Sequence, residues 1–526
     1  KNEIMHVSDL DYNNLRRTLA EAKTIKAVGE EIIQMLAALE DFQKKLWLKK
    51  KFVVQSDYCI TLDRVPESLY ADICANEEQH EEWKRLFDIE SIKATEGDMF
   101  SSGKQGYTGE LTVQFLKENP HLVLDTAFFN NDFKHRLLES IENIDAQCDG
   151  LLVNSENFQA LELLKEKQTE TISGIFIDPP YNTGDDGFVY KDNYSDSSWL
   201  TMINDRLRLS TELMSNRAST MISIGDEENE YLASLIRQNY GKENFFGTMV
   251  WEKKKKGSFL SGKVARMKDY IHCYAKNIDE FGGYVGEFNS DTETYPCVNP
   301  DNGISTRIFK AGIKSKYKLS NKTMKAGEVI SAGNMSLKLL SDLVIKDHVL
   351  IQDVTVEGNW RYTQDSLDEF MNDGAIYITQ DLYFRRLVKE ERQKIPKDLL
   401  LRLGDASTED TDFRKYDVTN VNRFGWGTNE DANEELHQII GEQYSVSYPK
   451  PSKLITLLLA LNRISDGVFL DYFAGSGTTG HAVIDLNKED GGDRKYILIS
   501  NSESNICKDV TLKRIKIFDP NVKFIN

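Results

Sequence analysis

Apolar runs of strand length alternate with segments of helical periodicity in two separated parts of the chain. In the first part, the sequence predicts strands at 150–153, 172–177 and 220–224 and helices at 155–166, 196–215 and 226–240. In the second part, it predicts a helix, a strand, a helix and a strand at 452–461, 467–470, 478–486 and 496–499. Strands that alternate with helices are typical of a parallel sheet with helices on its faces. We therefore expect an α/β fold.

The length of 526 residues is too great for one ordinary domain and predicts several. Residues 1–130 are expected to form an N-terminal helical and mixed region, which starts with a helix at 11–50. Residues 131–277 and 444–526 carry the α/β pattern. Residues 278–443 are rich in Asp, Asn, Gly and Thr and predict an inserted domain of mixed structure. Within it, the polar stretch 405–434 predicts a long loop.

Composition restricts the functional class. The net charge of −19 argues against a protein that coats nucleic acid, although a local basic cleft on an acidic body remains compatible with it. We find no apolar run near the ~18 residues of a membrane span, and the charged N-terminal segment does not resemble a signal peptide. The six cysteines form no Cys-x-x-Cys pair and the eight histidines no His-x-x-x-His pair. We therefore expect no structural metal, no disulfide scaffold and a reducing cytoplasm as the location.

The segment from Asp178 to Gly184 reads Asp-Pro-Pro-Tyr-Asn-Thr-Gly and directly follows the strand predicted at 172–177. Two prolines remove two backbone donors and fix two φ angles, so the strand must end here. α/β folds place ligands at the carboxyl ends of parallel strands. We therefore expect Asp178 and the Pro179 carbonyl to accept hydrogen bonds from the amino group of a planar base, on which Tyr181 stacks. The alternative is a strand-ending turn with a capping Asp.

A glycine-rich segment, Asp471 to Gly480, joins the strand predicted at 467–470 to the next helix. Glycines allow a tight turn and a close approach to a ligand, and the start of a helix offers free N–H groups to an anion. The spacing Gly-x-Gly-x-x-Gly is weak evidence for a dinucleotide site. In a dinucleotide site, an acidic residue about 20 positions after the glycines binds the ribose. Here the next strand ends in Ser500-Asn501 at that place, and the acidic Glu503 comes a few positions beyond it. The segment therefore favours a ligand held mainly by the Phe-Ala-Gly-Ser-Gly loop.

A run of four lysines is the strongest local basic feature of the sequence. It consists of Lys253, Lys254, Lys255 and Lys256 and follows the apolar residues 249–251. One interpretation is a phosphate clamp beside a bound DNA strand, and the other is a solvated loop. The clamp predicts that replacing all four lysines lowers the salt dependence of DNA binding.

Together, the Asp-Pro-Pro-Tyr and Phe-Ala-Gly-Ser-Gly motifs resemble those of amino-group DNA methyltransferases that use S-adenosylmethionine. In that family the first motif marks the target-amine site and the second the cofactor site. The amine motif comes first here, by 293 residues (471 − 178), which is the permuted order of the β class. The chain is still more similar to the modification subunits of type III restriction–modification systems. The stretches that carry this resemblance are 49–63, 150–161, 187–194, 197–200, 448–451 and 489–492.

The resemblance implies a Rossmann-like, doubly wound methyltransferase sheet in permuted order, with residues 278–443 as the target-recognition domain. It implies S-adenosylmethionine as cofactor, no metal, and methyl transfer to N6 of an adenine flipped out of double-stranded DNA. It also implies a homodimer and a restriction (helicase–nuclease) subunit as partner, for which the N-terminal region would serve dimerisation or docking. The catalytic residues it implies are Asp178, Pro179, Pro180 and Tyr181.

The resemblance also identifies candidate cofactor-binding residues. They are Asp471, Phe473, Ala474, Gly475, Ser476, Gly477, Thr478, Thr479, Lys450, Ser198 and Asn501. Of these, Lys450 is expected either to neutralise the cofactor carboxylate or to be a surface lysine. The acid missing after the second strand leaves the ribose contact open.

Three other functions remain compatible with the sequence. Methylation of cytosine N4 needs the same amine chemistry and differs only in the modified nucleoside. A DNA-binding specificity or scaffold subunit would need no catalysis of its own, although Asp178 and the 475–477 turn argue against it. A nicotinamide oxidoreductase would share the glycine pattern. The DNA recognition sequence cannot be derived from the chain.

Overall fold

The structure is a computed structural model that divides into two compact units. Unit 1 comprises Lys1–Gly283, Lys397–Val418 and Asn422–Asn526, and unit 2 comprises Tyr284–Pro396 and Thr419–Val421. The structure describes residues 12–48, 53–95, 105–183, 194–256, 264–288, 293–332, 335–389, 392–402, 414–441, 448–501, 503–519 and 521–525. Parts of two stretches that carry the family resemblance, residues 49–52 of 49–63 and residues 187–193 of 187–194, lie outside these residues. The predicted insertion 278–443 encloses unit 2 and extends beyond it at both ends.

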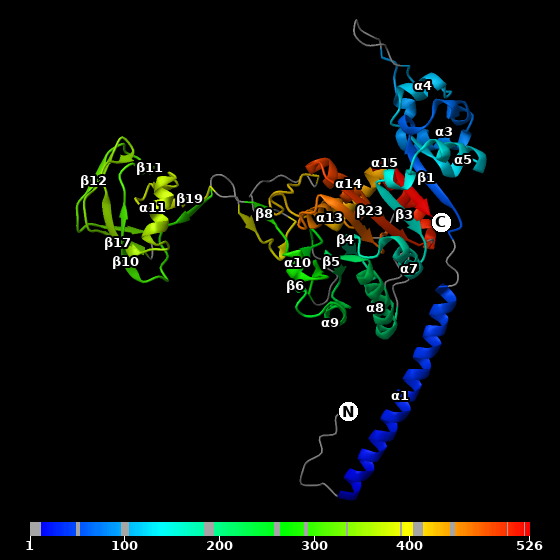
Figure 1. Cartoon of the computed structure of the whole chain (residues 1–526), viewed down its shortest axis with the longest axis horizontal. Helices are drawn as coiled ribbons and strands as arrows, with labels where there is room; N and C mark the ends of the chain where they lie inside the picture. Colours follow the sequence, from blue (N-terminus) through cyan, green and yellow to red (C-terminus); the bar gives the residue numbers. More distant parts are fainter. Residues whose placement is uncertain are drawn as a thin grey trace. The chain divides into compact units, whose positions relative to one another are not determined.

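Unit 1 is built on an eleven-stranded sheet that contains strands from both parts of the chain (Figure 1). The strand order is β2 (Val123–Asp125), β1 (Ser56–Thr61), β24 (Val522–Ile525), β3 (Gly150–Asn154), β23 (Asp493–Ser500), β22 (Asp466–Asp471), β4 (Ile172–Ile177), β5 (Met214–Ile224), β7 (Lys268–Ala275), β6 (Phe245–Glu252) and β21 (Leu399–Leu400). The strands from β24 to β5 run parallel, and β7 lies antiparallel to both of its neighbours. Strand β22 lies between β23 and β4 although it comes almost 300 residues after β4, so the permuted order is confirmed.

Helices cover both faces of this sheet, which confirms the doubly wound α/β fold (Figure 1). One group consists of α7 (Asn157–Gln168), α8 (Asp196–Leu213) and α9 (Asn229–Tyr240). The other consists of α13 (Ser452–Ala460), α14 (Thr478–Asp490) and α15 (Leu512–Phe518). Apolar side chains of the first group share one core with strand residues such as Ile175, Leu470 and Ile497. Burial of these side chains on two faces explains why the central strands are almost continuously apolar.

The N-terminal region adds a long helix, α1 (Tyr12–Leu48), and a small helical cluster. The cluster contains α2 (Tyr70–Cys74), α3 (Glu77–Phe87), α4 (Val113–Glu118) and α5 (Asn131–Ser140) and has its own apolar core around Trp83 and Phe115. A buried Lys516 of α15 joins it to the sheet, because its ammonium donates to Glu82 Oε1 at 2.8 Å and also to Asp125. None of the described helices has the length and apolar content that a bilayer span needs.

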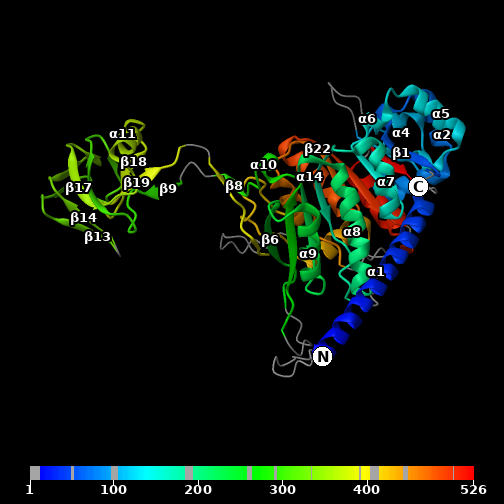
Figure 2. The same cartoon turned by 60° about the horizontal axis from the view of Figure 1, so that its bottom comes forward.

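Unit 2 contains a sandwich of two sheets, the helix α11 (Gln364–Asn372) and a short two-stranded sheet of β8 (Glu287–Phe288) and β20 (Gln393–Lys394) (Figure 2). The four-stranded sheet has the order β10 (Ile304–Phe309), β17 (Val354–Asn359), β14 (Met335–Leu339) and β13 (Val329–Ala332). The seven-stranded sheet has the order β12 (Lys322–Met324), β15 (Leu343–Lys346), β16 (Val349–Leu350), β11 (Lys314–Ser315), β18 (Ile376–Ile378), β19 (Phe384–Leu387) and β9 (Thr294–Pro296). Side chains of both sheets share one core, in which the rings of Phe309 and Phe384 stack at 3.7 Å.

The long loop predicted for 405–434 is wrong at its end, because α12 (Asn429–Ile440) begins inside that stretch. Thr428 and Asp431 form a capping box, in which each side chain accepts a hydrogen bond from the other's backbone N–H. The polar residues that suggested a loop are the cap and first turn of a helix, whose apolar residues Leu436 and Ile440 come only later.

Candidate active site

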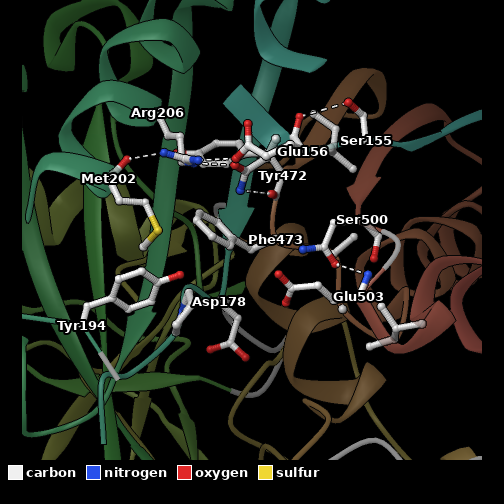
Figure 3. A pocket seen from close by; sticks show the side chains of 17 residues that line it. Ser155, Glu156, Asp178, Tyr194, Met202, Arg206, Tyr472, Phe473, Ser500 and Glu503 are labelled. Carbon is white, nitrogen blue, oxygen red and sulfur yellow. Dashed lines mark hydrogen bonds and ion pairs between the residues drawn. The ribbon is translucent and has the colours of Figure 1, made fainter. Parts of the chain in front are cut away.

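A cavity of about 220 Å³ lies where strands β3, β23, β22 and β4 end (Figure 3). Parallel strands bring their carboxyl ends to one edge of a sheet, so the loops after these four strands meet here. Asp178, Phe473 and Gly475 line this same cavity, although the motifs that contain them are far apart in the sequence. The residues that line it are Ser155, Glu156, Asn157, Asp178, Pro180, Tyr194, Met202, Arg206, Tyr472, Phe473, Ala474, Gly475, Ile499, Ser500, Asn501, Glu503 and Ile506.

The two carboxylate oxygens of Asp178 have different surroundings. Oδ2 accepts a hydrogen bond from the Lys450 ammonium at 2.6 Å. Oδ1 is buried and has no hydrogen-bond partner among the residues that the structure describes. A buried acceptor without a donor is costly and therefore unusual. The lysine thus holds one oxygen and leaves the other ready to accept a hydrogen bond in the cavity.

Neighbouring contacts hold the Asp-Pro-Pro-Tyr segment in place. The fully buried Trp199 of α8 donates its indole N–H to the Pro180 carbonyl at 2.8 Å. Asn182 has a left-handed φ of 58° and fixes Tyr194 from both sides. Its amide donates to the Tyr194 carbonyl at 3.1 Å, and its Oδ1 accepts from the Tyr194 N–H at 2.7 Å. The segment that carries Asp178 is therefore anchored beyond the rigidity of its two prolines.

Tyr181 is held at its hydroxyl by two residues that the sequence did not reveal. The hydroxyl lies 2.8 Å from Ser223 Oγ and donates to Asp269 Oδ2 at 3.1 Å. Burial, followed by the nearby Asp178 and Asp269 charges, raises the pKa of Tyr181 far above its ordinary value, so the phenol stays neutral. Gly225 packs against the ring, because a Cβ there would lie 2.8 Å from Tyr181 Cδ2. Tyr181 is thus fixed in place close to Asp178, although it is not among the residues that line the cavity.

The glycine-rich turn is shaped by hydrogen bonds to Asp471. Its carboxylate accepts from the Phe473 N–H at 2.9 Å and from the Thr479 hydroxyl at 2.5 Å. Gly475 and Gly477 have left-handed φ values of 49° and 80°, a region that favours glycine. At Gly475 the turn therefore brings backbone to the edge of the cavity, next to the side chain of Phe473, and α14 starts directly behind it.

Four of the predicted cofactor residues line the cavity, and others support the turn from outside it. Phe473, Ala474, Gly475 and Asn501 line the cavity. Thr478 ties the turn to the segment that carries Lys450, because its hydroxyl donates to the Lys450 carbonyl at 3.2 Å and lies 3.0 Å from Ser476 Oγ. Asp471 and Thr479 shape the turn from inside. Ser198 is an exposed residue of α8 that accepts a hydrogen bond from Ser195 and is not among the residues that line the cavity.

Burial raises the pKa of Asp471 from 3.8 to about 7, because the charged form loses hydration that its two hydrogen bonds replace only in part. Between pH 4 and 7 the folded state therefore keeps a proton that the unfolded state has lost. This bound proton stabilises the folded state. Its contribution to the unfolding free energy is complete below about pH 4 and disappears as the pH rises to about 7. The asparagine variant Asp471→Asn does not lose this contribution. The difference between its unfolding free energy and that of the wild type should therefore rise with pH, by up to ~1.4 kcal/mol per pH unit.

Urea unfolding of the wild type and Asp471→Asn at several pH values between 4.5 and 7.5 measures this difference. Asp466→Asn, on the exposed first residue of the same strand, is the matched control and should show a difference that does not change with pH. A flat difference for Asp471→Asn as well would mean that Asp471 is ionised over the whole range.

The cavity also contains a charged cluster that the sequence analysis missed. The Arg206 guanidinium donates to Glu156 and Asn157, and to the Met202 carbonyl at 2.9 Å (Figure 3). The amide of Asn157 donates in turn to the Tyr472 carbonyl at 2.9 Å. Glu156 and Asn157 follow strand β3. Their position directly after a predicted parallel strand could have identified them as residues of the site. Glu503, which the sequence placed slightly late for a ribose contact, also lines the cavity.

The lysine run is not a row of four solvent-exposed cations. Lys253 lies 2.6 Å from the buried Asp269 and is itself largely buried, and Lys255 pairs with Asp431 at 2.5 Å. Lys253 thus supports the aspartate that holds Tyr181, and its Nζ lies 5.8 Å from the centre of the Tyr181 ring. Lys253 and Lys255 thus already have carboxylate partners within the fold, and the four-lysine phosphate clamp stays a prediction.

Comparison with known proteins agrees with this geometry. A family model described as DNA methylase matches residues 172–510. The chain is 27% identical over 395 residues to the type III restriction-modification enzyme StyLTI Mod subunit of Salmonella typhimurium, covering 70% of this chain and 54% of that protein. It is 27% identical over 458 residues to the EcoPI Mod subunit of Escherichia phage P1, covering 79% and 66%. The chain thus spans about half to two thirds of the length of these relatives.

Proposed function

This chain belongs to the DNA methylase family, and from that membership we propose that it methylates N6 of adenine in double-stranded DNA with S-adenosylmethionine as the donor. We propose further that it is the modification and specificity subunit of a type III restriction–modification system. The proteins named as type III Mod subunits to which it is similar support this assignment. Its substrate places the proposed activity in the cytoplasm.

One observation carries the proposal. The unpartnered Asp178 Oδ1 is buried, and Asp178 lines the same cavity as the Phe473-Ala474-Gly475 turn. A ligand that binds at this turn and a base whose amine reaches Asp178 would therefore meet in one space. An amino group is a donor that suits the free carboxylate oxygen, and the glycine backbone leaves room for a close approach by a cofactor.

Asp178 would act on the amine by accepting a hydrogen bond at Oδ1. The lone pair of an aromatic amine is delocalised into the ring, so the free amine is a poor nucleophile. The carboxylate stabilises the positive charge that develops on the nitrogen, which is electrostatic preorganisation. Lys450 fixes the orientation of the carboxylate through Oδ2, so that Oδ1 does not need to rotate into place. Bound S-adenosylmethionine supplies a methyl group that its sulfonium already activates.

Tyr181 would hold the target base outside the helix. Removing a base from the duplex costs a few kcal/mol. Stacking on an aromatic ring returns ~1–3 kcal/mol per base. The contacts of the Tyr181 hydroxyl with Ser223 and Asp269 keep the ring in place before a base arrives, so little ordering remains to be done on binding.

Identification of the modified nucleoside tests the proposal. The purified chain is incubated with unmethylated genomic DNA and methyl-labelled cofactor, and the DNA is digested to nucleosides. The label should appear in N6-methyladenine. Label in N4-methylcytosine would keep the amine chemistry and change the target base. DNA binding without any label would favour the specificity or scaffold subunit instead.

We further propose that α1 mediates formation of a homodimer, which also provides a docking site for a restriction subunit. The helix spans 37 residues, and large apolar side chains along it are exposed. Ile25, Ile32 and Leu39 recur every seven residues with exposures of 73%, 53% and 50%. A seven-residue apolar repeat on a long helix is typical of a coiled-coil contact. A second copy of α1 is the partner we expect.

Replacing Ile25, Ile32 and Leu39 with lysine should convert a dimer into a monomer, because three charges would then face each other across the seam. Light scattering after size-exclusion chromatography measures the mass in solution. The control variant places lysine at Ala27, Gln34 and Ala37, on the opposite side of the helix by its 3.6-residue period, and should remain a dimer. An unchanged dimer in the first variant would rule out α1 as the contact.

A further inference from the structure

A row of side chains crosses the seven-stranded sheet of unit 2. The strand pairing places Lys346 of β15 opposite Val349 of β16, and Val349 opposite Lys314 of β11. Lys314 lies beside Tyr377 of β18, and Tyr377 lies opposite Arg385 of β19. Residues paired across strands point to the same side of a sheet. These five residues, the Lys314 row, therefore form a continuous line over five strands.

The Lys314 row faces away from the core of unit 2. Neighbours along each strand are buried, as expected when successive side chains alternate between the two faces. These buried neighbours are Ile313, Ser315, Ile345, Leu350, Ile376, Ile378, Phe384 and Arg386. Lys314 and Lys346 are exposed, while Val349, Tyr377 and Arg385 are half-buried. The row is thus the outer surface of the sheet.

The chain segment that contains Lys314 is strongly basic in an acidic chain, although its basic residues lie on more than one surface of unit 2. Between residues 302 and 327 there are seven basic residues and no acidic residue, whereas the net charge of the whole chain is −19. The seven are Arg307, Lys310, Lys314, Lys316, Lys318, Lys322 and Lys325. The ammonium of Lys316 lies 4.4 Å from the centre of the Tyr377 ring, which adds a cation beside the row. The nearest acid in sequence to the row is Asp347, in the turn after β15.

The row is long enough to face several phosphates of a nucleic acid strand. Neighbouring strands of a sheet are ~4.8 Å apart, so Lys346, Lys314 and Arg385, on every second strand, follow each other at ~10 Å. Phosphates of one DNA strand rise by ~3.4 Å each along the helix axis. The row of ~20 Å is therefore long compared with the axial rise of one phosphate, and Tyr377 provides an aromatic surface between two cations.

We propose that the Lys314 row binds the phosphate backbone of double-stranded DNA. The identity of the partner rests on the proposed function, and the surface itself is additional to it, because the catalytic cavity is lined by residues of unit 1 and the row belongs to unit 2. The row would be a basic contact surface in addition to the one predicted for the lysine run at 253–256.

Salt-dependent DNA binding by the full chain tests this surface. The test variant carries Lys314→Gln, Lys316→Gln and Lys346→Gln. Binding to a short random-sequence duplex is measured by fluorescence anisotropy between about 50 and 200 mM salt. Because each phosphate contact contributes ~0.9 to the slope of log K against log salt, we expect the slope to fall by about 2–3 and binding to weaken at least ~10-fold at the lower salt. The turnover rate at saturating DNA should remain within about twofold, since cofactor and base meet elsewhere.

A matched control also removes three positive charges, but from other surfaces of unit 2. It carries Lys310→Gln, Lys325→Gln and Lys338→Gln. Lys338 lies on the outer face of the four-stranded sheet, and Lys310 and Lys325 pair with Asp368 and Asp342. This variant should keep nearly the full slope. Single charge reversal, Lys314→Glu, should weaken binding further than Lys314→Gln.

Failure of this inference is distinguishable from failure of the proposed function. If the wild type methylates DNA but the row variant binds with an unchanged slope and affinity, the Lys314 row is not the DNA surface. Equal losses in the row variant and in the control would also overturn the inference, because they would reflect net charge alone. Absence of methylation by the wild type would contradict the proposed function and leave the binding result to stand by itself.

Discussion

Replacing Asp178 with alanine should abolish methyl transfer while DNA and cofactor binding remain nearly unchanged. Asp178 Oδ1 is the unpartnered acceptor in the cavity, and its contact with the amine strengthens as positive charge develops on nitrogen. Loss of one such preorganised contact lowers turnover by ~10²–10³. Loss of the oriented carboxylate also removes the partner of Lys450, so we expect the effect at the upper end of this range or beyond it. Single-turnover transfer of a labelled methyl group measures the rate.

Two further variants make this prediction specific. Asp178→Asn keeps the size of the side chain and removes its charge, so it should lose most of the rate as well. Asp466→Ala removes an exposed carboxylate at the start of the neighbouring strand β22 and should leave the rate unchanged. Near-normal turnover by Asp178→Ala would remove this residue from the mechanism, and tenfold weaker binding of DNA or cofactor would show that its role is structural.

Lys450→Met should destabilise the fold and slow catalysis, and a second substitution at Asp178 should restore only the stability. The lysine side chain is 7% exposed and that of Asp178 is 23% exposed, so the single variant leaves a poorly hydrated carboxylate without its counter-ion. Breaking a buried pair costs ~3–5 kcal/mol, and the partial exposure of Asp178 reduces our expectation to about 1–3 kcal/mol. The double variant Asp178→Asn, Lys450→Met should recover most of this loss and stay inactive.

Steady-state kinetics decide between the two roles of Lys450. If it orients Asp178, Lys450→Met lowers kcat at least about tenfold with little change in KM for the cofactor. If it neutralises the cofactor carboxylate instead, KM for the cofactor rises and kcat is preserved. Urea unfolding of the four proteins in the cycle supplies the coupling energy, and strictly additive losses would mean that the 2.6 Å contact contributes nothing to stability.

The sequence predicts the central sheet well because its strands are buried on both faces. Strand β4 covers Ile172–Ile177, as the apolar run predicts. The start of β5 at Met214 was missed, because Asn216 and Arg217 are exposed polar residues that interrupt the apolar pattern. The strands of unit 2 are short and alternate exposed with buried residues. Their pairing, such as that of Lys314 with Tyr377, joins residues distant in sequence and leaves no local signal.

The candidate site was predictable where its residues form compact motifs. Asp178, Phe473 and Gly475 could be expected to meet, because both motifs follow parallel strands of one sheet. Asp269 could not be assigned, since it reaches Tyr181 only through the antiparallel pairing of β7 with β5. The contact of Lys450 with Asp178 likewise depends on a turn at Tyr448, whose φ of 57° has no signature in the sequence.

A structure of the chain with duplex DNA and a non-transferable analogue of the cofactor tests the central claim most directly. The account predicts an extruded adenine in the cavity, with its amine nitrogen about 2.7–3.2 Å from Asp178 Oδ1, its ring against Tyr181 and the analogue at the Phe473–Gly475 turn. A bound target base whose amine lies away from Asp178, or an analogue bound elsewhere than this cavity, would contradict it.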